Sequence, residues 1–142
     1  MKIFLLILFC LCFHLSNVFA EEIDIIVNDK NVMTELSKEQ ISNYFFKHNR
    51  AWPNGTPVRF FDHRDESEER KIFLVSILKK TSREVELFWI GQKLYTGNSA
   101  PLQITSDTMV ASMVARFPGA IGYVSESFSG APGVKKITIK KD

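Results

Sequence analysis

The chain has 142 residues, of which 45% are hydrophobic and 24% are charged. Its 18 basic and 16 acidic residues give a formal net charge of +2 at pH 7, and this near balance of signs argues against a nucleic-acid-binding protein. The length is sufficient for one domain with a hydrophobic core of its own, and no internal repeat indicates a solenoid.

The N-terminal segment predicts a secretory signal peptide over residues 1–20. Lys2 gives it a positive start, residues 3–13 are almost wholly apolar, and the small residue Ala20 ends it. We therefore expect cleavage after Ala20, one mature domain over residues 21–142, a periplasmic or secreted location and no membrane attachment after cleavage. An uncleaved membrane anchor is the alternative. Both cysteines fall in this segment, so the mature domain is expected to fold without a disulfide.

Alternating strand and helix patterns follow along the chain and predict an α/β fold. Runs of β-branched and aromatic residues predict strands, and apolar residues three and four positions apart predict helices. The predicted strands cover residues 23–28, 58–62, 120–124 and 134–139. The predicted helices cover residues 36–46, 66–78, 82–95 and 106–117. This alternation favours a three-layer arrangement, in which a mixed sheet is flanked by helices.

Local patterns mark some of the boundaries. Ser37 followed by Gln40 is the pattern of a capping box at a helix start. Near the end of the domain, Pro118 cannot continue a helix, and Gly119 tolerates the geometry of the turn that follows. Gly122 lies inside an apolar strand, which indicates that another group of the protein or a ligand approaches the backbone closely there.

Residues 118–124 read PGAIGYV and resemble a segment of the substrate-binding proteins of phosphate ABC transporters. Other parts of the chain follow the order of that family. Residues 44–52 stand where the family has I-[FY]-x-G-K-x-x-x-W, with Lys47 in the place of the glycine. Residues 63–69 stand where it has R-x-D-G-S-G-T. The resemblance extends over residues 23–124.

This resemblance implies that the domain is similar to one lobe of a type II periplasmic binding protein. Residues 21–142 leave no room for the second lobe that such proteins have. The function that the resemblance implies is that of an exported, non-enzymatic solute-binding-like protein, whose ligand is phosphate or another oxyanion.

The resemblance also implies an oxyanion site at the start of the second predicted helix. The serine of the family falls on Ser67 and its arginine on His63, with Arg64 one place further along. A helix N-terminus and an arginine both favour an anion. Glu68 and Glu69 replace the glycine and threonine of the family, and their charges oppose an anion. An acidic, capped helix start without a ligand is therefore the alternative.

A second function stays open, that of a periplasmic protein-interaction or sensory module that has lost its ligand. The face that two-lobed relatives use against their other lobe would then contact a protein partner or a second copy of the chain. The many aromatic residues of the domain fit either a core or such an interface.

Other kinds of chemistry find no support in the chain. The serines after the last PGAIGYV residue are not in a G-x-S-x-G elbow and no histidine follows them, so we predict no catalytic residues. His48 and His63, even with Asp62 and Asp65 nearby, make a poor zinc-binding set. No metal and no cofactor are expected.

Overall fold

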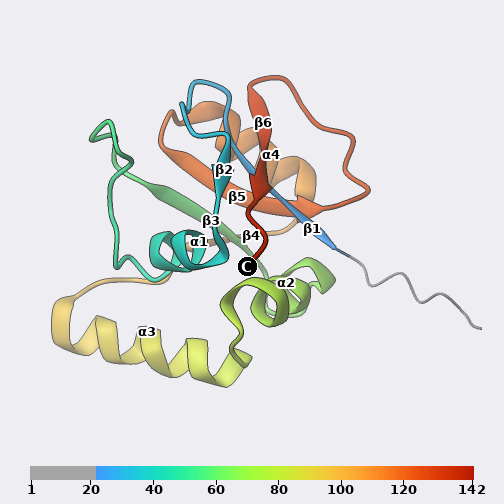
Figure 1. The fold of residues 1–142 in the computed structure, drawn as a ribbon. Coiled ribbons are helices and arrows are strands. Elements are labelled where there is room, and N and C mark those ends of the chain that lie inside the picture. Colours follow the sequence, from blue (N-terminus) through green and yellow to red (C-terminus); the bar gives the residue numbers. More distant parts are fainter. Residues whose placement is uncertain (1–21) are drawn as a thin grey trace, which may run out of the picture.

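The structure is a computed structural model that describes residues 22–142 (Figure 1). The predicted signal peptide, residues 1–20, lies outside the described residues. In chain order, the elements are β1 (Ile23–Asn28), β2 (Glu35–Leu36), α1 (Lys38–Phe45), β3 (Arg59–His63), α2 (Glu68–Phe73), the π-helix η1 (Leu74–Leu78), α3 (Ser82–Thr96), β4 (Leu102–Ile104), α4 (Asp107–Arg116), β5 (Ala120–Ser125) and β6 (Val134–Ile139).

The strands form one six-stranded mixed sheet in the order β2-β6-β1-β5-β3-β4. β1 is antiparallel to both β5 and β6, while β3 is parallel to β5 and β4. The first strand of the described chain is therefore held on both sides by the last two strands, and β3 lies between two neighbours near the other edge.

Helices cover both faces of the sheet, which confirms the predicted three-layer α/β fold (Figure 1). On one face, Ile25 and Val27 belong to a core that includes residues of α1, α2 and η1. On the other face, Ile26 and Phe61 pack with residues of α4. Neighbouring residues of β1 reach opposite cores because side chains alternate along a strand.

The predicted strands and helices are present, and the predicted capping box is confirmed. The hydroxyl of Ser37 accepts from the backbone N–H of Gln40, and the Gln40 side chain accepts from the N–H of Ser37 at 2.8 Å. Two strands were not predicted, β2 and β4. They have two and three residues and form the two edges of the sheet, so they are too short to show an alternating pattern.

The helix predicted over residues 66–78 is wrong as a single α-helix. α2 begins after the N-cap Ser67 and changes at Leu74 into η1, whose turns are wider. At this junction the hydroxyl of Ser76 donates to the carbonyl of Ile72 at 2.7 Å. Apolar spacing alone does not distinguish the two kinds of helix, because both place buried residues such as Phe73 and Ile77 on one side.

α3 is the longest helix of the described residues and lies at the periphery, apart from the sheet (Figure 1). Val85 and Trp89 are its buried residues. The ring centroid of Phe88 lies 4.8 Å from that of Phe46, which follows α1. The opposite side of α3 exposes large apolar side chains. No helix within residues 22–142 is long and apolar enough to cross a membrane.

The turn between α4 and β5 joins several segments through one backbone carbonyl. The Gly119 carbonyl accepts from the indole N–H of Trp52 at 3.0 Å and from the backbone N–H of Arg59 at 2.9 Å. A Cβ atom on Gly119 would lie 1.9 Å from the carbonyl oxygen of Pro57. The close approach predicted at Gly122 is also present, since a Cβ there would lie 2.7 Å from Val110 Cγ1.

We expect Gly119→Ala to lower the free energy of unfolding by about 2 kcal/mol or more, because the added methyl group forces backbone to move against backbone. Gly91→Ala is the matched control. Nothing lies within 4 Å of a Cβ at Gly91, which is inside α3, so alanine should raise the free energy of unfolding by roughly 0.5–1 kcal/mol. Urea unfolding of both variants tests this, and equal effects of the two changes would contradict it.

Candidate functional site

A buried polar network lies where β3 ends and α2 covers the sheet. The Asp62 carboxylate accepts from Arg70 Nε at 3.1 Å, from the backbone N–H of His63 at 2.8 Å and from the hydroxyl of Tyr123. Asp62, Arg70 and Tyr123 are all buried. The network therefore joins β3, β5 and α2 through one carboxylate.

The environment of this network changes its acid–base behaviour. Burial raises the pKa of Asp62, although hydrogen bonds from Tyr123 and the charge of Arg70 act in the opposite direction. Burial, followed by the nearby charge of Asp62, raises the pKa of Tyr123. Tyr123 is thus neutral at physiological pH and donates to Asp62. The arrangement holds the end of β3 in place, and it contains no nucleophile paired with a base.

The structure places the three predicted site residues in different surroundings. His63 is buried, and its Nε2 lies 2.8 Å from the carbonyl oxygen of Tyr123 and 3.3 Å from Asp107 Oδ1 at the start of α4. Arg64 is exposed. Ser67 is the N-cap of α2, and its Oγ accepts from the backbone N–H of Arg70 at 3.1 Å.

Arg64 and Ser67 are brought together by a turn, while His63 faces away from them. The backbone N–H of Ser67 donates to the carbonyl of Arg64 at 3.1 Å. The exposed carboxylates of Glu66 and Glu68 are next to Ser67 in the chain, and Glu68 pairs with Lys71 at 2.9 Å. Arg64 and Ser67 are accessible to solvent, whereas His63 is buried beneath the loop. An oxyanion site at this loop stays a prediction.

Arg70 is a residue that the sequence reasoning missed. It lies one helical turn after Ser67, its side chain is 6% exposed, and it also approaches Asp65 at 3.3 Å. An arginine in an acidic helix start is usually solvated, so no sequence signal marks its burial. The buried partner Asp62, five residues before Ser67, could have indicated it only once the strand and the helix were placed together.

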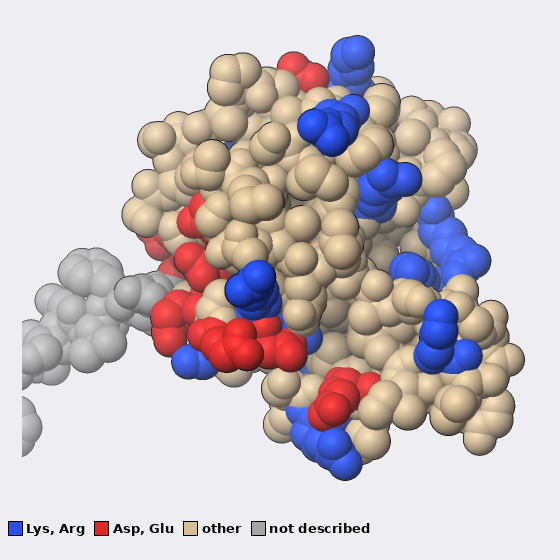
Figure 2. Space-filling model, turned by 180° about the vertical axis from the view of Figure 1, so that it is seen from behind, with Lys and Arg blue, Asp and Glu red and all other residues tan. Residues whose placement is uncertain are grey.

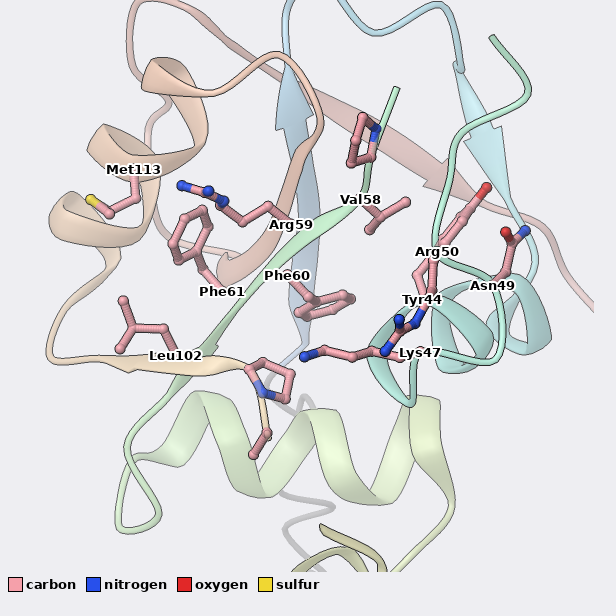
Figure 3. Close-up of a pocket in the computed structure, with 13 residues that line it drawn as sticks. Tyr44, Lys47, Asn49, Arg50, Val58, Arg59, Phe60, Phe61, Leu102 and Met113 are labelled. Atoms are coloured by element: carbon pink, nitrogen blue, oxygen red, sulfur yellow. The ribbon is translucent and has the colours of Figure 1, made fainter. Parts of the chain in front are cut away.

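A groove of about 530 Å³ lies at the other end of β3, and sequence reasoning missed it as well (Figure 3). Lys47 and Arg50, from the end of α1 and the loop after it, line one side, and Arg59 lies on the side of α4. Phe60 lies between them, and Leu102 of β4 is also part of the lining. The groove thus has cationic groups around an apolar floor.

Of the residues that the structure describes, no Asp or Glu lines this groove, and its three cations contact only neutral groups. Lys47 Nζ donates to the carbonyl of Ser99 at 2.7 Å, and the guanidinium of Arg50 donates to Asn98 Oδ1. The guanidinium carbon of Arg59 lies 4.1 Å from the ring centroid of Phe117. Among residues 22–142, none of the three cations has a carboxylate within 4.0 Å. The groove is therefore suited to an anion.

The electrostatics and the backbone of Lys47 show that this cation is held in the groove at a cost. Burial lowers the pKa of Lys47, and repulsion by Arg50 lowers it further. The backbone of Lys47 has φ 58°, in the left-handed region, directly after the C-cap of α1. Helices commonly place glycine at this position because a Cβ atom is unfavourable there. Lysine at this position combines backbone strain with a charge in the groove.

The charges of the surface are distributed unevenly beyond these two sites. Figure 2, which views the molecule from behind, shows acidic side chains mostly gathered on one side of that face and many of the basic side chains along the other. Within the described part of the chain, no group of three or more His, Cys, Asp or Glu residues could hold a metal ion.

Solved structures of phosphate-binding proteins share this architecture. The chain is similar to an ABC-type phosphate transport receptor from Vibrio cholerae, with a TM-score of 0.66 and 21% identity over 85% of this chain and 47% of that one. It is also similar to PstS from Borrelia burgdorferi, with a TM-score of 0.67 and 13% identity over 85% of this chain and 48% of that one. The chain spans about half the length of these structures, and its fold matches one lobe of phosphate-binding proteins. This defines its class as a solute-binding-like fold.

The sequence itself shows the family. The chain belongs to the family described as the MrkH-like, YcgR-like domain, whose model matches residues 11–89. No curated protein sequence matches the chain. The family match ends within α3, whereas the structural similarity covers 85% of the chain.

The raised pKa of Asp62 predicts a pH dependence of stability. A carboxyl group whose pKa is raised by folding binds its proton more tightly in the folded state, so its contribution to stability is present at low pH and is lost as the pH rises. We expect the free energy of unfolding of the wild type, relative to that of Asp62→Asn, to fall as the pH rises above about 4, the ordinary pKa of an aspartic acid. Urea unfolding of both proteins across this range is the measurement. A difference that grows with pH would mean that the Arg70 ion pair outweighs burial.

Proposed function

We propose that this protein is an exported, non-enzymatic solute-binding-like protein whose ligand is phosphate or a related oxyanion. The observation that carries the proposal is the groove beside β3, where Lys47, Arg50 and Arg59 have no carboxylate partner among the described residues. Structures of the same fold are of phosphate transport receptors, which are binding proteins and not enzymes.

The groove offers an oxyanion suitable donors. A guanidinium group presents two parallel N–H groups to an oxyanion, and an ammonium group adds a point charge. Lys47 and Arg50 already donate to neutral oxygens of the loop between α3 and β4, so an anion would exchange a neutral acceptor for a charged one. Charge-assisted hydrogen bonds of this kind are roughly twice as strong as neutral ones.

The loop between β3 and α2 is the second location for the same ligand. Arg64 and the hydroxyl of Ser67 would contact the anion, together with backbone N–H groups at the start of α2. His63 would act from behind, by holding the end of β3 against Tyr123 and Asp107. The neighbouring glutamates oppose this location, and for that reason the groove is our first choice.

We expect Lys47→Gly to weaken phosphate binding by about tenfold while raising the free energy of unfolding by up to about 1 kcal/mol. The binding falls because the groove loses a charge, and the stability rises because glycine adopts the left-handed backbone without strain. Isothermal titration with phosphate, with sulfate for comparison, and urea unfolding measure the two effects.

Lys79→Gly is the matched control for this prediction. Lys79 has φ 53° at the end of η1, so glycine should stabilise the fold there too, but its side chain is exposed and does not line the groove. Phosphate binding of Lys79→Gly should equal that of the wild type. Equal affinities of the two glycine variants would exclude Lys47 from the site.

Arg64→Ala and Ser67→Ala separate the two locations. If the loop holds the anion, both variants should lose affinity by about tenfold each, and Lys47→Gly should not. If the groove holds it, the loop variants should bind phosphate as the wild type does. Absence of any binding heat in the wild type up to millimolar phosphate would contradict the proposed ligand at both locations.

An interaction module is the second candidate function, and the exposed side of α3 favours it. Leu94 and Tyr95 are 77% and 89% exposed, although α3 already buries Val85 and Trp89 on its other side. Contiguous exposed apolar surface on a small domain commonly marks an interface. Phosphate titration and the association state of the protein distinguish the two functions, because each can fail without the other.

A further inference from the structure

α3 carries apolar side chains on two of its faces, and only one face packs on the domain. Val85 and Trp89 are buried. Leu87, Ile90 and Leu94 are 51%, 48% and 77% exposed. These three residues are spaced by three and four positions, which aligns them along one side of the helix in the pattern of a helix-pairing seam.

A hollow lies beside this ridge, between α3 and the rest of the domain. It has a volume of about 590 Å³, and Ile90, Leu94 and Gln103 are among the residues that line it. One buried donor in its lining, Trp89 Nε1, has no hydrogen-bond partner in the described part of the chain. α3 therefore offers an exposed apolar ridge with a depression next to it, and such a shape can receive side chains of another molecule.

An acidic and a basic residue flank the ridge, so that two antiparallel copies of α3 would bring opposite charges together. Glu86 and Lys93 also line the hollow, and they lie on opposite sides of Ile90 along the helix. Among residues 22–142, Glu86 pairs only with exposed Arg83, at 3.2 Å, and such surface pairs contribute little to stability. Lys93 donates to a neutral hydroxyl, that of Ser99, at 3.2 Å.

We propose that α3 pairs in antiparallel orientation with α3 of a second copy of this chain. A two-fold axis near Ile90 brings Leu87 opposite Leu94 of the second copy. The same axis brings Glu86 opposite Tyr95 and within two residues, roughly 3 Å along the helix, of Lys93 of the second copy. The long side chains of Glu86 and Lys93 can therefore pair at both ends, as a symmetric dimer requires. A parallel pair would instead bring Glu86 next to Glu86. The proposal rests on the interaction function above and names its partner.

The first test is the association state of the purified full-length protein by light scattering and sedimentation at micromolar concentration. We expect a dimer for the wild type and a monomer for Leu94→Glu, since a carboxylate in the seam cannot be buried. Val75→Glu is the matched control, because Val75 is equally apolar and 74% exposed but lies on η1. It should remain a dimer. Circular dichroism of both variants verifies that the fold is unchanged.

The second test addresses the orientation of the pair. Glu86→Lys and Lys93→Glu should each raise the dissociation constant of the dimer by about tenfold, and the double reversal should restore it, because the charges then match again. A double variant that stays as weak as the single ones would overturn the antiparallel register.

Two results would overturn the dimer itself: a monomeric wild type throughout the micromolar range, or equal dissociation by Leu94→Glu and Val75→Glu. Titration of the Leu94→Glu variant with phosphate tests the pairing proposal and the solute-binding proposal independently of each other. A monomeric variant that still binds phosphate would show that the groove works without pairing, and a dimeric wild type that binds no phosphate would leave the pairing proposal intact.

Discussion

The buried carboxylate of Asp62 is the constraint on which much of this structure depends. A carboxylate removed from water costs several kcal/mol unless it is paired and hydrogen-bonded, so its partners cannot move away independently. Arg70 and Tyr123 supply the pairing, and they come from the helix and the strand that flank β3. One ionisable group thereby fixes the relative positions of a strand, its neighbour and the helix above them.

The rigidity of β3 also relates the two locations considered for a ligand. Arg59 begins the strand and lines the groove, and His63 ends it beside the loop that precedes α2. A strand paired on both sides changes little in length or direction, so the two locations stand at fixed distance from each other. A scaffold of this kind positions side chains on adjoining loops without further ordering.

Much of the fold could be predicted from the sequence because its signals are local. Ser37 with Gln40 and the Pro118–Gly119 turn mark their boundaries through nearest neighbours alone. The change from α2 to η1 and the edge strands depend on tertiary contacts, which no short pattern contains. Residue types suggested an anion site at Ser67, but the groove joins residues of four separate segments. The burial of Arg70 follows only from its long-range partner Asp62.

The place of β1 in the sheet has a consequence for how the chain reaches its native state. Ile23 pairs with Ser125, and Asn28 pairs with Val134. β1 is synthesised early, but it can pair in the sheet only after β5 and β6, the last two strands, have been synthesised. Pairings so distant in sequence carry a large loop-closure entropy and slow the rate-limiting step. Until the C-terminal strands emerge from the ribosome, β1 therefore has neither of the strands that pair with it in the sheet.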